Sequence, residues 1–164
     1  MADVGGGTGA VLAAVLSANP DLHGVLVDQE LVVAAAPAVL SEAGVEDRTT
    51  IVAGDFFTDV PAGADVYLLV RVLHDWDDDD AVRILRSVRA ALEPDGRVLV
   101  VDAVIGPPDR DPLTKFLDLM MMVSAGGRER SEPEWAALLA RADLRLVGTR
   151  RATSTRHVIE AAPA

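Results

Sequence analysis

Two short motifs in this 164-residue chain carry residue types that could do chemistry. A Leu-His-Asp-Trp sequence at 73–76 follows an apolar run, residues 66–70, that is typical of a strand. Far upstream, residues 3–9 read Asp-Val-Gly-Gly-Gly-Thr-Gly, a turn that lets backbone approach a nucleotide closely. Open α/β sheets bind ligands at the carboxyl edge of their strands. The two motifs therefore predict the His74 imidazole beside a nucleotide-derived cofactor, which suggests an enzyme.

The composition narrows the possible classes of function. Half of the residues are apolar, and 26 acidic against 15 basic residues give a formal net charge of −11. This charge opposes binding to a polyanion, so nucleic acid is not expected as a partner. The lack of cysteine excludes a disulfide, thiolate catalysis and a cysteine-ligated zinc ion. Because no apolar stretch is long enough to span a bilayer and no signal-like segment is recognised, we expect a cytoplasmic protein without a membrane partner.

Strand-like and helix-like segments alternate along the chain, which is the pattern of a parallel sheet covered by helices on both faces. We expect an α/β fold with a Rossmann-like, mostly parallel sheet and a late antiparallel strand. The expected strands are residues 23–28, 49–53, 66–70, 98–101 (extending toward 105), 144–149 and 157–161, and the expected helices are 31–40, interrupted by Pro37, 77–92, 112–123 and 132–140. Only residues 1–4 are available as a strand before the glycine turn, so we expect a truncated first strand and a chain that is part of a longer protein.

The glycine turn by itself fits two classes of cofactor-binding protein. The spacing of Gly5, Gly7 and Ala10 satisfies a loose dinucleotide fingerprint, which keeps a nicotinamide-dependent dehydrogenase open. The acid-x-Gly-x-Gly-x-Gly pattern formed by Asp3, Gly5, Gly7 and Gly9 resembles the signature of class I S-adenosylmethionine-dependent methyltransferases. The dehydrogenase is less favoured, because nothing in the chain supplies its second nucleotide-binding motif.

Three residues at the ends of later strands support the methyltransferase. Asp28 follows the second expected strand and could accept hydrogen bonds from ribose hydroxyls in either class. Asp55 and Phe56 follow the third strand, and an acid with an aromatic neighbour resembles the adenine-binding position of methyltransferases. Taken singly, Asp28 or Asp55 could equally be a strand-end cap.

With His74, Asp75 and Trp76 added, the resemblance narrows to the O-methyltransferases related to plant caffeate and flavonoid enzymes and to bacterial polyketide and phenazine tailoring enzymes. It extends to a Gly-Gly-Arg-Glu-Arg sequence at 126–130. The resemblance implies that His74 is the general base that takes the proton of a substrate hydroxyl. It also implies that two carboxylates orient the histidine, and these positions fall on Glu129 and Asp102. Asp102 is one methylene shorter than the glutamate usual in plant members, so its contact with His74 is expected to be the weaker one.

The same resemblance assigns further positions. Met120 and Ser124 fall where related enzymes line the acceptor pocket, although core packing is an equally good interpretation for Met120. Arg71 falls near the cofactor in bacterial members. The family is metal-independent, so no metal site is expected. The aspartates at 77–80 are better explained as a solvated helix start, where carboxylates favour the positive end of the helix dipole.

These observations lead to one main hypothesis and two alternatives. Residues 1–164 are expected to form the catalytic domain of a methyltransferase that transfers a methyl group from S-adenosylmethionine to a hydroxyl of a small aromatic acceptor. The resemblance implies an additional amino-terminal domain that dimerises in the full-length protein, and none of it is present in this sequence. A truncated, catalytically inactive cofactor-binding fragment is the first alternative, and the nicotinamide-dependent dehydrogenase is the second.

Overall fold

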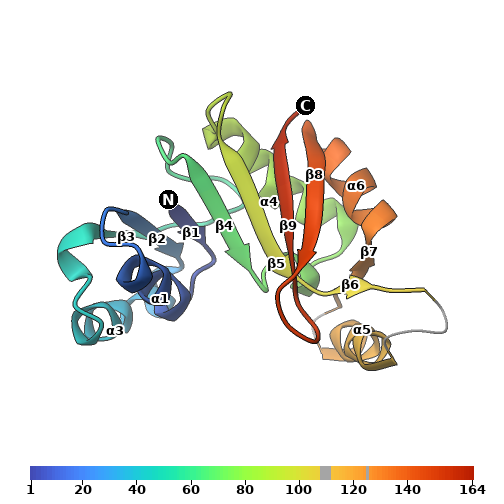
Figure 1. The fold of residues 1–164 in the computed structure, drawn as a ribbon, viewed down its shortest axis with the longest axis horizontal. Coiled ribbons are helices and arrows are strands. Elements are labelled where there is room, and N and C mark those ends of the chain that lie inside the picture. The colour runs from blue at the N-terminus through green and yellow to red at the C-terminus, as the bar shows by residue number, and fades with distance from the viewer. Residues whose placement is uncertain (108–111, 125) are drawn as a thin grey trace.

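A computed structural model describes residues 1–107, 112–124 and 126–164. Its main feature is a seven-stranded sheet in the order β3-β2-β1-β4-β5-β9-β8 (Figure 1). The strands are β1 (Ala2–Val4), β2 (Gly24–Asp28), β3 (Thr49–Ala53), β4 (Val66–Val70), β5 (Arg97–Asp102), β8 (Leu144–Arg151) and β9 (His157–Pro163). Strands β1 to β5 are parallel, whereas β9 runs antiparallel to both of its neighbours. The expected Rossmann-like sheet with a late antiparallel strand is thereby confirmed.

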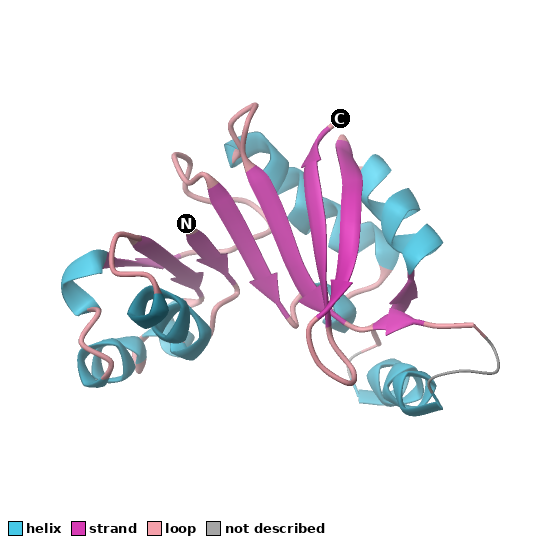
Figure 2. Ribbon diagram, viewed as in Figure 1, coloured by secondary structure: helices cyan, strands magenta, loops and turns pink. Residues whose placement is uncertain are grey.

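Helices cover the sheet from two sides. The described helices are α1 (Ala10–Ala18), α2 (Glu30–Val33), α3 (Ala36–Glu42), α4 (Asp78–Ala91), α5 (Pro112–Ser124) and α6 (Glu132–Ala140), with 3-10 turns η1 (Glu46–Arg48) and η2 (Leu73–Asp75). Figure 2 shows α4 and α6 behind β4, β5, β9 and β8, while no described helix lies in front of these four strands. Among the described residues, every helix is too short or too polar to span a bilayer.

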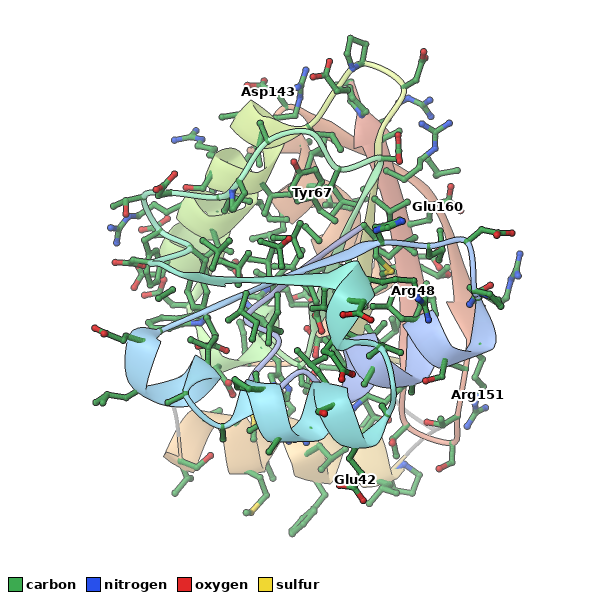
Figure 3. All side chains as sticks on the ribbon, turned by 90° about the vertical axis from the view of Figure 1, so that its left-hand side faces the viewer. Glu42, Arg48, Tyr67, Asp143, Arg151 and Glu160 are labelled. Carbon is green, nitrogen blue, oxygen red and sulfur yellow. The ribbon has the colours of Figure 1, made fainter. Side chains whose placement is uncertain are left out.

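Two buried cores hold these layers together. In the smaller core, Leu12 and Leu16 of α1 pack with Leu26 of β2 and Leu40 of α3. The larger core joins β1, β4, β5 and β9 to α4 and α6, and its fully buried aromatic residues are Tyr67 and Trp135. Tyr67 lies inside the molecule, and the phenol oxygen is 3.0 Å from the Ala91 carbonyl, so it is satisfied without water (Figure 3). Burial of this apolar surface stabilises both layers on the sheet.

Local sequence explains where two of the helices begin. Helix α4 begins at Asp78 because the side chain of Asp77 accepts a hydrogen bond from the Asp80 N–H, at 2.9 Å, and caps the first turn. The expected helix over 31–40 is two helices, and Pro37 lies in the first turn of α3 rather than at the break. Proline is tolerated there because an N–H in a first turn has no partner within the helix. The break itself falls at Ala34 and Ala35.

The strand expected to continue toward residue 105 instead changes sheet. β5 ends at Asp102, and β6 (Val104–Ile105) pairs in parallel with β7 (Arg130–Ser131) in a separate two-stranded sheet. This small ladder brings the end of β5 next to the segment before β7. The arrowheads of β4 and β5 point to one edge of the main sheet, and α5 lies beyond it (Figure 1). The carboxyl edge therefore collects the residues after β1, β2, β4 and β5.

Candidate active site

The glycine turn after β1 is tied to the end of β2. Gly5, Gly7 and Gly9 have φ values of 71°, 63° and 81°, a region that L side chains rarely adopt. The Gly5 N–H donates to the Val27 carbonyl at 2.8 Å, and the Gly7 N–H donates to Oδ2 of Asp28 at 2.8 Å. Gly9 serves the packing of α1, because an added Cβ would lie 3.1 Å from Leu26 Cδ2. The turn thus joins Asp28 to the backbone that faces the carboxyl edge.

Asp3 is a buried carboxylate that the turn encloses. Both of its oxygens lack a hydrogen-bond partner among the described residues. Burial raises the pKa of Asp3 to about 6, the nearby charge of Asp28 adds to the effect, and the Leu12 backbone amide opposes it in part. A buried carboxylate without a partner is unfavourable unless a ligand supplies a donor or a positive charge. Asp3 is therefore suited to hold a cationic amine.

A trough runs along the turn from Asp3 to Asp28. It consists of two adjacent hollows that share Gly5 and Arg71. Arg71 has a left-handed backbone, with φ of 56°, and its N–H donates to the Val101 carbonyl at 3.1 Å. The first hollow is lined by residues 3, 5–8, 10, 11, 70 and 71, and the second by residues 5, 28, 29, 32, 56, 71, 72, 75 and 76. The trough has an acid near each end and an aromatic wall beside Asp28, a combination that suits a nucleoside carrying an amino acid.

The wall of the trough contains one aromatic residue that sequence analysis missed. Trp76 lines the second hollow together with Phe56, and their rings meet edge to face with centroids 6.1 Å apart. Phe57 supports Trp76 from behind, with centroids 4.8 Å apart, and the Arg83 guanidinium lies over the Phe57 ring. Trp76 belonged to the motif that indicated the family, but its position in the motif gave no hint that it faces the trough.

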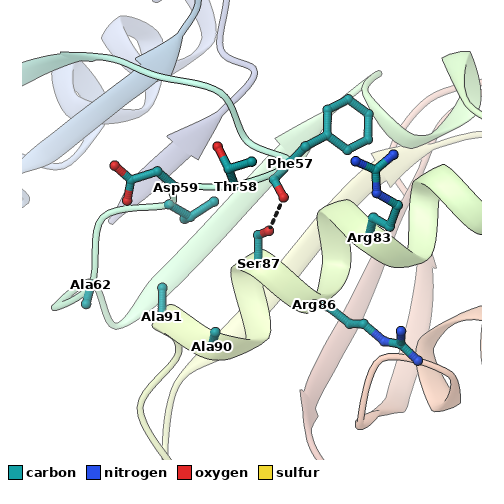
Figure 4. Close-up of a pocket in the computed structure, with 10 residues that line it drawn as sticks. Phe57, Thr58, Asp59, Ala62, Arg83, Arg86, Ser87, Ala90 and Ala91 are labelled. Carbon is teal, nitrogen blue, oxygen red and sulfur yellow. Dashed lines mark hydrogen bonds between the residues drawn. The ribbon is translucent and has the colours of Figure 1, made fainter.

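A different hollow lies on the far side of Phe57 (Figure 4). It lies between the 57–62 loop and α4, and it shares no residue with the trough. Ser87 of α4 donates a hydrogen bond from Oγ to the Phe57 carbonyl at 2.9 Å, as Figure 4 shows. This contact fixes the loop that carries Phe56 against α4.

The carboxylate of Asp55 contacts the backbone of its own loop. Its Oδ1 accepts a hydrogen bond from the Phe57 N–H at 2.9 Å, and it does not line either hollow of the trough. This hydrogen bond is compatible with the capping role that the sequence left open, and a cofactor contact of Asp55 stays a prediction. The acid shapes the loop, and Phe56 reaches the trough.

His74 lies in the turn η2 and is 1% exposed. Its Nδ1 atom is 3.1 Å from Oε1 of Glu129 and 3.7 Å from Oδ1 of Asp102, so Glu129 accepts the hydrogen bond and Asp102 lies just outside that range. Donation from Nδ1 leaves Nε2 as the basic nitrogen of a neutral ring. Nε2 lies 3.4 Å from Asp75, which lines the trough. His74 itself lines neither hollow, so its link to the trough runs through Asp75.

Burial and charge act in opposite directions on this cluster. Burial lowers the pKa of His74, but the hydrogen bond to Glu129 and the charges of Asp102, Glu129 and Asp75 together raise it above its ordinary value. Burial raises the pKa of Asp102 to about 7, and the nearby imidazole opposes that rise only in part. The charges of His74 and Asp102 thus influence each other's titration.

The segment before β7 holds the His74 turn in place. The Arg128 N–H donates to the His74 carbonyl at 2.9 Å. The buried Arg130 guanidinium donates to the carbonyls of Leu73 and Trp76, at 2.9 and 3.0 Å, and pairs with Asp78 at the start of α4. One side chain thus anchors the backbone on both sides of His74, which fixes the direction of the imidazole.

Helix α5 connects to the cluster through its polar face. Oδ1 of Asp118 accepts a hydrogen bond from the Glu129 N–H at 2.8 Å. Met120 is 46% exposed, so core packing was the wrong interpretation for it. The Ser124 hydroxyl donates to the Met120 carbonyl one turn earlier, at 2.7 Å. Both residues therefore lie on a helix that is anchored at the site and exposes apolar side chains.

Two acidic groups bear on whether a metal could bind. The run at 77–80 is a helix start: Asp77 caps α4, and the three aspartates that follow pair with Arg130, Arg141 and Arg83. In the other group, one potential ligand atom each from His74, Asp102 and Glu129 lies within 4.8 Å of the others. The His74–Glu129 hydrogen bond explains the approach of two of these side chains, and Asp102 lies beside the pair, 3.7 Å from Nδ1, without a hydrogen bond to it.

Comparison with known proteins identifies the family. The O-methyltransferase domain family matches residues 1–145. The mitomycin biosynthesis 6-O-methyltransferase of Streptomyces lavendulae is 51% identical over 146 residues, which are 88% of this chain and 41% of that protein. The structure of the mitomycin 7-O-methyltransferase MmcR matches with a TM-score of 0.95 at 45% identity, covering 99% of this chain and 48% of that one.

A third similar structure contains ligands. It is an O-methyltransferase from neocarzinostatin biosynthesis in complex with S-adenosylmethionine and 2-hydroxy-5-methyl naphthoic acid. The TM-score is 0.91 at 38% identity, and the match covers 99% of this chain and 48% of that one. The chain spans less than half the length of each of these three relatives. Because the family match extends over most of its residues, the chain belongs to the O-methyltransferase domain family.

Proposed function

We propose that this chain is the catalytic domain of an enzyme that transfers a methyl group from S-adenosylmethionine to a hydroxyl of a small aromatic acceptor, with His74 as the general base. The observation that carries the proposal is the orientation of the imidazole. Glu129 accepts the hydrogen bond from Nδ1, and Nε2 faces Asp75 at the wall of the trough. A basic nitrogen is thus presented beside a site suited to a nucleoside cofactor.

The residues of the trough fit S-adenosylmethionine. The unpartnered Asp3 carboxylate would hold the α-amino group, which carries a positive charge. Asp28, already fixed by the Gly7 N–H, would accept hydrogen bonds from the ribose hydroxyls. Phe56 and Trp76 would contact the adenine ring. When bound, the cofactor supplies an electrophilic methyl group on a sulfonium ion.

The chain's own residues then handle the proton. A phenol titrates near ~10 and a free imidazole near ~6.5, so the transfer is uphill unless the imidazolium is stabilised. Nε2 of His74 accepts the hydroxyl proton as the acceptor oxygen takes up the methyl group. Glu129 accepts the hydrogen bond from Nδ1 throughout and stabilises the cation that forms. Asp102, at 3.7 Å from Nδ1, contributes mainly through its charge.

We also propose that residues 1–164 form one catalytic domain of a longer, dimeric protein. Two features support this. Helix α5 exposes Leu113, Phe116, Leu119, Met120, Met122 and Val123, and one face of β4, β5, β9 and β8 carries no described helix (Figure 2). Apolar surface of this kind is usually covered by a partner. An additional domain over α5 would complete the acceptor pocket near Met120 and Ser124. A chain that binds the cofactor without transferring the methyl group is the alternative that these exposed surfaces favour.

Calorimetric titration of the chain tests the proposal directly. S-Adenosylhomocysteine should bind, and Asp28→Ala should weaken its binding, whereas NAD should not bind measurably. Tight binding of NAD with no response to S-adenosylhomocysteine would overturn the proposal in favour of a dehydrogenase. Transfer of a radiolabelled methyl group to hydroxylated naphthoic acids, measured with a full-length protein, then separates an active enzyme from a fragment that only binds.

A further inference from the structure

A second arginine approaches the His74 cluster from the opposite end of the chain. Arg156 lies in the connection between β8 and β9, which is closed by the Ala152 N–H donating to the Arg156 carbonyl at 2.9 Å. The Arg156 N–H donates to Thr153 Oγ1 at 3.0 Å. From this turn the side chain reaches inward, so that Nη1 lies 3.9 Å from Oε1 of Glu129 and the side chain is only 19% exposed. The guanidinium thus lies at the rim of a buried site.

The oxygen that Arg156 approaches is the oxygen that holds the imidazole. Oε1 of Glu129 lies between Nδ1 of His74, at 3.1 Å, and Nη1 of Arg156. The other Glu129 oxygen and both oxygens of Asp102 are buried without a hydrogen-bond partner among the described residues. A nearby positive charge stabilises two adjacent buried carboxylates: burial and the charge of Glu129 raise the pKa of Asp102, and the charge of Arg156 opposes that rise.

Within the described part of the chain, Arg156 is the one arginine whose guanidinium forms an ion pair within 4 Å with this pair of acids, and it does so with Glu129. Arg130 is also buried nearby, but its guanidinium is engaged by Asp78 and by the carbonyls of Leu73 and Trp76. The two arginines therefore have different tasks. Arg130 anchors the backbone around His74, and Arg156 is left to balance the charge of the acids.

We propose that Arg156 is a positioning residue of the His74 site: its guanidinium is the counter-ion of the Glu129–Asp102 pair and keeps Glu129 as the acceptor for the His74 Nδ1–H. The role in methyl transfer rests on the function proposed above. Without this positive charge the His74 cluster holds a proton more tightly. The pH below which methyl transfer slows, because His74 is protonated, therefore moves upward. Arg156 thereby helps to set the pH at which His74 is free to act as a base.

Several charged groups besides Arg156 face the cluster, and a change in any of them would also move its titration. They are Asp75 of η2, Asp118 of α5, Arg130 of β7 and His157 of β9, the last of which pairs with Asp102 in the strand register. The test must therefore isolate the charge at position 156. Substitution of Arg156 is feasible, because its side chain hydrogen-bonds to no described backbone group and the turn is closed by main-chain atoms and Thr153.

The experiment is an NMR titration of the histidine side chains in the free chain. There are three histidines, and the exposed His23 serves as an internal reference. In Arg156→Gln the midpoint reported by His74 should rise by roughly 0.5–1.5 pH units, the size of one charge acting over several ångströms in a partly buried site. Arg156→Lys should retain most of the wild-type value. Arg145→Gln, which removes one positive charge from the far end of β8, should leave it unchanged.

A second set of variants assigns the shift to the imidazole. In the Asp102→Asn background one of the coupled carboxyl groups no longer titrates, and the rise caused by Arg156→Gln should persist. An unchanged or lower midpoint in Arg156→Gln, or an equal rise in Arg156→Lys, would overturn the proposal. Should Arg156→Gln fail to fold, Arg156→Thr gives the same loss of charge with a side chain suited to the strand end.

The titration needs neither cofactor nor acceptor. Failure to bind S-adenosylhomocysteine would therefore count against the proposed function alone. If the protein binds the cofactor and transfers the methyl group, but the His74 midpoint is unchanged in Arg156→Gln, that result would count against this inference alone.

Discussion

Gly127 lies against the backbone carbonyl of His74. A Cβ atom added to Gly127 would lie 2.0 Å from the His74 oxygen and 2.5 Å from the carbonyl carbon of Asp75. Both neighbours are main-chain atoms, so neither can rotate away as a side chain could. Glycine is needed at position 127 for space. The close approach of the two backbone segments lets the Arg128 N–H reach the His74 carbonyl. The backbone conformation of Gly127 lies outside the left-handed region, so conformation is not the reason for the glycine.

Gly127→Ala should therefore displace the His74 turn. We expect a loss of stability of roughly 1–3 kcal/mol, the usual cost of forcing an extra methyl group into a packed site. Urea unfolding would measure it. Gly148→Ala is the matched control, because an added Cβ at Gly148 meets no atom within 4 Å. Equal stability of the two variants would contradict the close approach.

The second prediction concerns catalysis in a full-length protein with its acceptor. His74→Ala should leave cofactor affinity nearly unchanged and lower kcat roughly 10²–10⁴-fold, the usual cost of removing a general base. Glu129→Gln should have a smaller effect, since it removes the charge that stabilises the imidazolium. Asp102→Asn should have the smallest, because its carboxylate is 3.7 Å from Nδ1. Wild-type turnover in His74→Ala would show that the acceptor ionises without help.

The third prediction concerns the pH dependence of cofactor binding. The pKa of Asp3 is about 6 because burial and Asp28 disfavour its charged form, and a bound ammonium group favours that form. Affinity for S-adenosylhomocysteine should therefore rise with pH, by about tenfold between pH 5 and 7 if only the ionised carboxylate binds. Calorimetry at several pH values would measure this dependence.

Asp3→Asn should bind more weakly and lose that pH dependence. Adenosine, which lacks the amino acid part, is the matched ligand control and should bind with little dependence on pH across this range. A rise in affinity that persists in Asp3→Asn would assign the titration to another group.

The fourth prediction concerns stability. Burial raises the pKa of Asp102 from 3.8 to about 7, so between these values the folded chain binds a proton that the unfolded chain releases. The contribution of Asp102 to the stability of the fold is therefore largest below about pH 4. It falls as pH rises to about 7, by at most about 4 kcal/mol. The pKa of His74 is also raised, so its contribution to stability is likewise lost as pH rises above the ordinary pKa of histidine.

Asp102→Asn should remove most of this slope and leave the variant more stable than the wild type at pH 8. Chemical denaturation at pH 5 and pH 8 would measure it, with the exposed Asp21→Asn as the control. An unchanged slope in Asp102→Asn would mean that Asp102 is not protonated in the folded chain near neutral pH.

The sequence by itself determined most of the elements and the glycine turn after β1. Alternating strand and helix patterns, the glycines at 5, 7 and 9, and the aspartates at 77–80 act over a few residues, so their effect on structure is local and readable. The position of His74 just after β4 followed in the same way. The resemblance to a family, rather than any spacing, indicated Glu129 and Asp102 as its partners.

Only the tertiary structure decided what each of these side chains contacts. His74 and Asp75 are neighbours in sequence, and their side chains approach to 3.4 Å, yet the first is buried and the second lines the trough. The β6–β7 ladder brings Glu129 to a histidine 55 residues earlier, and the β8–β9 turn brings Arg156 to the same oxygen. These contacts depend on strand pairing between distant segments, which local patterns do not encode, and so the charge balance of the site emerged only from the fold.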